Sequence, residues 1–193
     1  MTDIGSYKVP IVVRFESEEA LLLPANKADM PIDWHFEWPL IFTKAKREGF
    51  TVVKLEYQKQ VWGLVNYGIF DRQADGPNKL ETFVLIENLE ANPRSRGKRV
   101  DRLLEPIGKW LIWYCVKIGL EKCSGNQTVL FLISRPESVG YYLDKISMEL
   151  RDVIRLEEGE VYAFGLSRSL ALEYLQRQER EWGTPRRADE RSL

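Results

Sequence analysis

The chain has 193 residues, of which 44% are hydrophobic, and its 28 basic and 29 acidic residues nearly cancel. The near-zero net charge gives no support to nucleic-acid binding through a basic surface. The apolar run 111–118 is too short to span a bilayer, and residues 1–5 lack the pattern of a signal peptide. Two cysteines and one histidine nearly exclude a Cys/His zinc site and suggest no disulfide framework, so we expect a cytoplasmic protein.

The first half of the chain predicts short strands and two helical segments. β-branched and aromatic runs predict strands, and Gln58-Lys59-Gln60 predicts a hairpin turn between two of them. The expected strands are 8–15, 50–57, 61–70 and 80–89. Composition predicts helices at 18–23 and 32–48.

The second half is expected to be richer in helix. Apolar residues at three-to-four spacing from Val100 to Ile118 predict a long helix with one buried stripe. Pro106 fits this helix only if it starts late, near Glu105, with Pro106 in its first turn. After it we expect a strand at 128–133, a helix at 137–148, a strand at 160–166 and a helix at 167–182. Helices interleaved with strands predict an α/β (α+β) fold, in which a sheet packs against helices. Residues 1–182 are expected to form a single domain, and the polar, basic residues 183–193 a disordered tail.

A basic loop joins the strand 80–89 to the long helix. It reads Pro93-Arg94-Ser95-Arg96-Gly97-Lys98-Arg99-Val100. Backbone amides and cations at the positive end of a helix form a binding site for anionic phosphates. The alternative interpretation is a solvated helix start with a simple turn at Gly97.

This region resembles the core of the GNAT superfamily of acyl-CoA-dependent N-acyltransferases. The family's cofactor loop, Pro-x-x-Arg-Gly-x-Gly-φ-Gly followed by Leu-Leu, is similar to Pro93-x-x-Arg96-Gly97-Lys98-Arg99-Val100-Asp101 with Leu103-Leu104. The run 141–148 (Tyr-Tyr-Leu-Asp-Lys-Ile-Ser-Met) is similar to the family's Phe-Tyr-Glu-Lys-Leu-Gly-Phe. Upstream, Val61-Trp62-Gly63-Leu64-Val65 looks like the strand after the family's first hairpin. The likeness covers roughly residues 50–165.

The resemblance implies a GNAT-like, mixed and mostly antiparallel sheet flanked by helices, with an added C-terminal helix. It implies transfer of an acetyl or other acyl group from acyl-CoA to an amine. The residues implied for acyl-CoA binding are Arg94, Arg96, Gly97, Lys98, Arg99, Val100 and Arg102.

Acyl transfer to an amine needs a base for the ammonium and an acid for the departing thiolate. Family members often take the base from the strand before the loop, where Glu87 is the candidate and Glu81 and Glu90 are the other carboxylates. Strand alternation puts Glu87 on an apolar face, and we expect it to be partly buried with a raised pKa. The resemblance implies Tyr142 as the acid, with Tyr141 one place away. A structural role remains open for each.

Several departures from the family pattern favour a second interpretation. Arg99 and Asp101 stand where the family has small residues, Leu143 stands at its Tyr, and Ser147-Met148 replaces its Gly-Phe. A catalytically inactive GNAT-like fold that acts as a protein-binding or assembly module is therefore the alternative. In such a module we expect Tyr141 or Trp110 to fill the cofactor cleft.

The sequence leaves the partners open. The acceptor would be a small-molecule or protein amine, and Trp182 in the C-terminal helix keeps a homodimer or another protein partner possible. We expect no metal and no membrane. Nucleic acid is a weaker third alternative, because no aromatic residues are interleaved with the basic loop.

Overall fold

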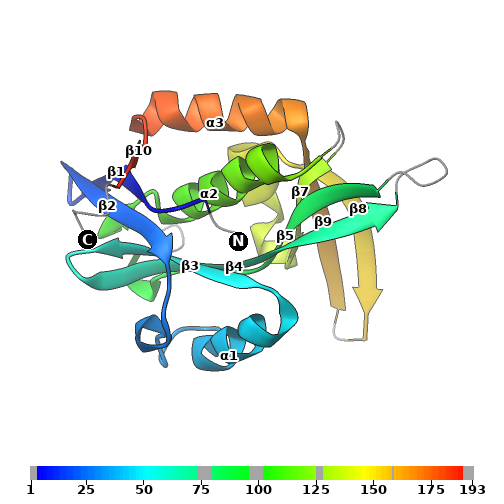
Figure 1. Cartoon of the computed structure of the whole chain (residues 1–193), viewed down its shortest axis with the longest axis horizontal. Coiled ribbons are helices and arrows are strands. Elements are labelled where there is room, and N and C mark those ends of the chain that lie inside the picture. Colours follow the sequence, from blue (N-terminus) through cyan, green and yellow to red (C-terminus); the bar gives the residue numbers. More distant parts are fainter. Residues whose placement is uncertain (1–3, 74–79, 96–101, 125–127, 158, 189–193) are drawn as a thin grey trace.

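The structure, a computed structural model, describes residues 4–73, 80–95, 102–124, 128–157 and 159–188. They form one twisted sheet with helices on both of its faces (Figure 1). The strand order is β10-β1-β2-β3-β4-β5-β7-β9-β8, and β6 pairs with β1 outside this path. The contact between β5 and β7 is parallel, and the other strand contacts are antiparallel.

The bounds of the elements are as follows. The strands are β1 (Tyr7–Val13), β2 (Glu16–Pro24), β3 (Thr51–Tyr57), β4 (Gln60–Gln73), β5 (Leu80–Ala91), β6 (Leu104–Glu105), β7 (Thr128–Ser134), β8 (Glu149–Leu156), β9 (Gly159–Ser167) and β10 (Arg186–Arg187). The helices are α1 (Trp38–Glu48), α2 (Ile107–Lys122) and α3 (Arg168–Trp182). Short helical turns lie at η1 (Lys27–Asp29), η2 (Pro93–Ser95) and η3 (Pro136–Ser138), and η4 (Tyr141–Ile146) is π-helical.

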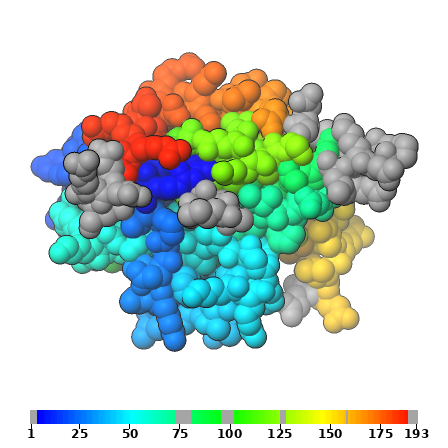
Figure 2. Space-filling view, in the orientation of Figure 1, coloured from blue at the N-terminus to red at the C-terminus, as the bar shows by residue number. Residues whose placement is uncertain are grey.

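The layers place α2 and α3 on one face of the sheet and α1 on the other (Figure 1). The β8–β9 hairpin extends from the sheet on the same side as α1, and the two project separately in the space-filling view (Figure 2). In the described ranges no helix is long and apolar enough to cross a membrane.

Helix α2 is the centre of the main core. It is buried almost all round rather than along the single stripe predicted, because the sheet covers one side and α3 the other (Figure 1). Its aromatic side chains keep their polar tips paired: Trp110 Nε1 donates to Pro10 O at 2.6 Å, and Tyr114 Oη donates to Gly5 O at 2.9 Å. Trp113 Nε1 donates to Glu179 Oε1 on α3 at 3.0 Å. These bonds fix α2 to β1 and to α3.

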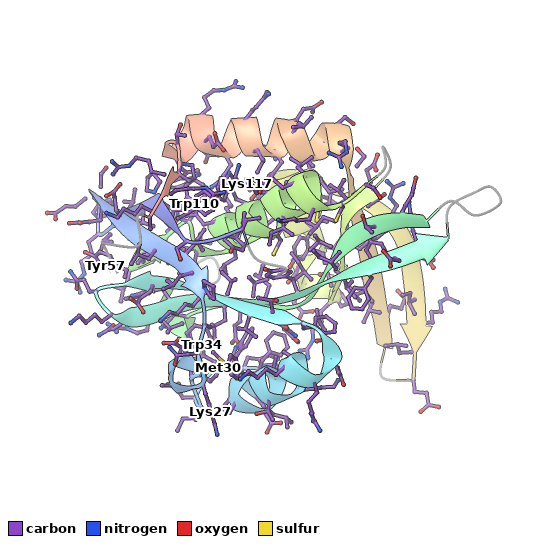
Figure 3. The ribbon with its side chains drawn as sticks, in the orientation of Figure 1. Lys27, Met30, Trp34, Tyr57, Trp110 and Lys117 are labelled. Carbon is purple, nitrogen blue, oxygen red and sulfur yellow. The ribbon has the colours of Figure 1, made fainter. Side chains whose placement is uncertain are left out.

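A second, smaller core lies under α1. Its buried members come from the η1 segment, from α1 and from the sheet face that α1 covers, and they are Met30, Trp38, Ala45, Val52 and Leu64. Figure 3 shows Met30 and Trp34 on this side of the sheet, with Trp110 and Lys117 on the α2 side. The sheet is therefore covered on both faces in its middle, and its strands are apolar on both faces there.

The structure confirms the expected mixed, mostly antiparallel sheet flanked by helices, but several elements differ from the prediction. Residues 18–23, predicted to be helical, lie in β2 because they pair with both β1 and β3. The helix expected at 32–48 begins at Trp38, and the segment 137–148 holds the short turns η3 and η4 in place of one helix. The long helix starts at Ile107, close to the late start that Pro106 indicated, since Leu104 and Glu105 pair with Val13 and Val12 and Pro106 is the N-cap. Strand β8, whose side chains are mostly exposed, was not predicted.

The chain after α3 returns to the sheet. Arg186 and Arg187 pair with Lys8 and Tyr7, and the Ala188 amide donates to Ser6 O at 3.0 Å. We expected disorder from residue 183 onward. Residues 183–188 instead follow β1, and residues 189–193 lie outside the described part of the chain.

Gly119 allows α2 to lie close to β7, and we expect its replacement by alanine to destabilise the fold. A Cβ at Gly119 would lie 2.9 Å from the Val129 carbonyl oxygen, and this oxygen cannot move without its strand. Chemical denaturation of Gly119→Ala should show a loss of about 1–3 kcal/mol. Gly140→Ala is the matched control, because its Cβ would make an ordinary 3.8 Å contact at helical φ and ψ. That control should be neutral or stabilising by about 0.5 kcal/mol.

Candidate functional site

The candidate site lies where β5 and β7 part. Their parallel register runs from Val84–Leu130 to Ile86–Leu132, and the two described strands pair no further although both continue. We call this point the β5/β7 fork. Beyond the fork, the backbone N–H and C=O groups of β5 that face β7 make no strand-to-strand hydrogen bonds with β7. A ligand can therefore approach the strand there.

A β-bulge in β5 lies at the fork. Opposite β4, Asn66 pairs with Asn88 and Tyr67 with Ile86, which leaves Glu87 as the extra residue. The Glu87 side chain is exposed, and its Oε2 accepts a hydrogen bond from Asn66 Nδ2 at 2.7 Å. The expectation of a partly buried Glu87 is therefore wrong, because the bulge interrupts the alternation on which it was based. The carboxylate is instead held at the surface by a buried amide.

Glu90 is not available as a base. It is 4% exposed, and its carboxylate accepts hydrogen bonds from the backbone amides of His35 at 2.8 Å and Phe36 at 3.1 Å. Trp38 Nε1 also donates to it at 2.8 Å. Glu90 thereby holds the segment before α1 against the sheet at the fork. His35 takes part in this contact through its backbone.

The start of α2 lies beside the fork. A Cβ at Gly108 would lie 3.2 Å from the Tyr141 hydroxyl and 3.9 Å from Leu89 Cδ2. The first turn of α2, strand β5 and the π-helical turn η4 therefore meet at Gly108. Burial raises the pKa of Tyr141, and the Arg102 guanidinium acts in the opposite direction. Tyr141 therefore stays protonated at neutral pH.

Tyr142 lies beside Tyr141, with ring centroids 5.4 Å apart. Its ring also packs against Phe164 of β9 with centroids 5.5 Å apart, and burial raises its pKa to about 12. It holds its proton at neutral pH, as an acid must. The hydroxyl beside Gly108 of α2 is that of Tyr141.

The two ends of the basic loop are described, and its centre is not. The Leu104 amide donates to Ser95 Oγ at 2.9 Å and closes the base of the loop. Arg94 lies over the Trp62 ring at 5.8 Å, and Arg102 forms an ion pair with Glu105 at 3.4 Å. Arg96, Gly97, Lys98, Arg99 and Val100 lie outside the described residues.

The structure thus places Glu87 on β5 at the fork, and it places Tyr141 and the first turn of α2 against the same strand at Leu89. A carboxylate at the surface can take a proton from an ammonium group, and a phenol can give one. Sequence reasoning missed Asn66, which orients Glu87, and Gly108, which admits the Tyr141 hydroxyl. No local sequence signal identifies either residue, because both act through contacts with distant segments. The described residues contain no group of three or more His, Cys, Asp or Glu residues able to hold a metal ion.

Solved structures of similar fold identify the architecture. A structure described as a bacterial toxin is 13% identical to this chain and has a TM-score of 0.56. The match covers 80% of this chain and 95% of the toxin chain, and the coverages below are given in the same order. The AtaTR complex bound with acetyl-CoA is 16% identical, with coverage of 79% and 96% and a TM-score of 0.51. Arabidopsis thaliana Naa50, in complex with the bisubstrate analogue CoA-Ac-MVNAL, is 13% identical, with coverage of 76% and 97% and a TM-score of 0.50.

No protein-family model and no curated protein sequence matches the chain. The structural matches show that the chain has the fold of the GNAT superfamily, as the sequence resemblance predicted. At these identities they show the fold alone.

We expect Glu90→Gln to destabilise the protein and Glu87→Gln to leave its stability nearly unchanged. In Glu90→Gln an amide group replaces one of the oxygens that accept from His35, Phe36 and Trp38, so a buried donor loses its partner. Urea unfolding should show a loss of about 2 kcal/mol. Glu87→Gln keeps an oxygen for Asn66 at an exposed position and should change stability by less than about 0.5 kcal/mol. Equal losses for the two variants would contradict the assigned role of Glu90.

Proposed function

We propose that the protein binds an acyl-CoA, acetyl-CoA in the first instance, and transfers its acyl group to an amine. The observation that carries this proposal is the β5/β7 fork directly in front of the first turn of α2. Acetyl-CoA and a CoA-containing bisubstrate analogue in two other proteins of this fold support it at the level of the superfamily.

The first turn of α2 offers backbone amides and the positive end of a 16-residue helix to a phosphate group. Gly108 has no side chain that would cover these amides, and Arg102 at the end of the loop supplies a cation. These features fit a pyrophosphate. Arg94, Arg96, Gly97, Lys98, Arg99 and Val100 remain the loop residues proposed to contact the acyl-CoA.

We assign Glu87 as the base and Tyr142 as the acid. The exposed Glu87 carboxylate can take a proton from the acceptor ammonium, directly or through a water molecule, and Asn66 holds it in place. Tyr142 keeps its proton at neutral pH and can give it to a departing thiolate. Tyr141 is the other phenol of this pair, and its position beside Gly108 makes it a competing candidate for the acid.

One observation favours the alternative, a GNAT-like fold that acts as a binding or assembly module. The Tyr141 hydroxyl occupies the space beside Gly108 in the first turn of α2. Filling of this space by Tyr141 was the expectation for an inactive protein. Trp110, the other expected filler, instead lies between α2 and β1 and bonds to Pro10.

Calorimetric titration of acetyl-CoA into the purified protein tests the proposal. We expect binding at micromolar concentration, weakened about tenfold or more by Arg96→Ala, because a charge-assisted contact with phosphate would be lost. Arg155→Ala is the control, since Arg155 is exposed on β8 and pairs with Glu160, away from the loop. Absence of heat and of any thermal shift at millimolar acetyl-CoA would overturn the acyltransferase proposal and leave the binding module.

The two tyrosines are separated by kinetics once an amine acceptor has been found. If Tyr142 is the acid, Tyr142→Phe should lower kcat about 100-fold with little change in KM for acetyl-CoA. Tyr141→Phe would then change kcat by less than about threefold. The reverse pattern would transfer the role of acid to Tyr141, and near-wild-type rates in both variants would remove the acid from the mechanism.

A further inference from the structure

A pocket of about 420 Å³ lies on the sheet face that α1 only partly covers. Its lining consists of two arginines, two hydroxyl residues and one aromatic ring, and these are Arg72, Thr128, Phe131, Arg151 and Ser167. It lies at the first residues of β7 and the last residues of β9. The β5/β7 fork begins at Leu132, about 13 Å along β7 from Thr128 but directly after Phe131. Only the aromatic part of the lining therefore adjoins the fork, and no lining residue is assigned a part in acyl transfer.

One wall of the pocket is Arg151, which lies flat over Gly165. A Cβ at Gly165 would lie 2.8 Å from Arg151 Nε and 3.0 Å from Thr128 Cγ2, so only glycine leaves room for the arginine there. Arg151 Nη2 donates to Thr128 Oγ1 at 3.2 Å and also contacts Glu149. The guanidinium is thus oriented by the sheet itself, while 41% of its side chain stays accessible.

The opposite wall is Arg72, which reaches across β5. Its guanidinium lies over the Phe131 ring at 5.5 Å and pairs with Glu81 Oε2 at 3.0 Å. Glu81 is 3% exposed, so this ion pair anchors Arg72 to the interior of the protein. The Arg72 side chain nevertheless remains 31% accessible. Stacking on the ring and pairing with the carboxylate hold the guanidinium in one orientation in the lining of the pocket.

The floor of the pocket is aromatic. Phe131 contacts Phe83 edge to face at 5.0 Å, and Phe83 in turn lies 6.3 Å from Phe70. These partly exposed rings come from three neighbouring strands. Two arginines above an aromatic floor combine the groups that recognise an oxyanion with a surface for a flat apolar body.

We propose that this pocket binds an aromatic or otherwise flat apolar molecule that carries an oxyanion group, a phosphate or a carboxylate. The oxyanion bridges Arg72 and Arg151 with Thr128 beside it, and the apolar body lies on Phe131. The volume is within the range of small-molecule sites. The inference does not depend on acyl transfer, because none of the lining residues is assigned a part in that reaction.

Two carboxylates near the pocket, Glu81 and Glu149, are expected to affect its affinity for an anion in different ways. Glu81 is buried beneath Arg72, whereas Glu149 is half exposed and competes with a ligand for Arg151. Removal of the Glu149 charge should therefore strengthen anion binding, and removal of the Arg151 charge should weaken it. Opposite effects of two neighbouring residues are hard to produce by a general loss of structure.

Calorimetric titration of the full chain with phenyl phosphate, benzoate, inorganic phosphate and benzyl alcohol tests the inference. We expect millimolar or tighter binding of phenyl phosphate or benzoate, and the stronger of the two identifies the preferred oxyanion. Inorganic phosphate should bind more weakly because it lacks a body for the Phe131 floor. Benzyl alcohol should give no heat, because it lacks the charge.

Variants then locate the site. Arg151→Gln should weaken binding about tenfold or more, Arg72→Lys should weaken it while keeping the pair with Glu81, and Glu149→Gln should tighten it severalfold. Arg155→Gln is the matched control on the same strand, outside the pocket lining, and should have no effect. Absence of binding by both aromatic anions, or equal weakening in Arg155→Gln and Arg151→Gln, would overturn the inference. Acetyl-CoA titration of Arg151→Gln keeps the two proposals distinct, because its acetyl-CoA affinity should be unchanged.

Discussion

The parting of β5 and β7 is the constraint on which the rest of this structure depends. Parallel strands normally continue their ladder, yet here it stops after Ile86 and Leu132. The bulge at Glu87 stands at the same point, and an extra residue in one strand increases its local twist. The exposed Glu87 carboxylate lies at this point, and the first turn of α2 and Tyr141 lie against the same strand at Leu89.

Helix α2 holds this arrangement in place through burial and close approach. A Cβ at Gly63 would lie 2.4 Å from Ile107 Cγ2, so the first turn of α2 rests directly on β4, while Gly119 brings its last turns against β7. The indole and phenol tips of α2 are paired with β1 and α3, which avoids the cost of unpaired donors in a core. Close contacts at its first and its last turns thus fix the position of α2 on the sheet.

The sheet face opposite α2 has a covered part, under α1, and an accessible part (Figure 1). Near the fork, Glu90 draws the segment before α1 onto the sheet, and the aromatic residues of that segment pack in the second core. Farther along β4 and β5, the phenylalanine floor and the two arginines remain accessible. One sheet face therefore presents the Glu87–Asn66 pair at the bulge and, farther along the same strands, an aromatic pocket with oxyanion-binding groups.

The sequence by itself determined the class of fold and most of its elements. Local patterns suffice to predict that β3, β4, β5, β7, α1 and α3 exist, because their β-branched, aromatic or apolar runs are recognisable in the sequence. The Pro93–Leu104 and 141–148 motifs point to the superfamily. Only the tertiary structure decided the rest. Residues 18–23 are a strand because two neighbours pair with them, and Leu104-Glu105 leave the helix for β1. Contacts between segments far apart in sequence also decide three features of the sites. They expose Glu87, they bury Glu90 beneath the segment before α1, and they place Arg151 over Gly165. Local periodicity carries no information about such contacts.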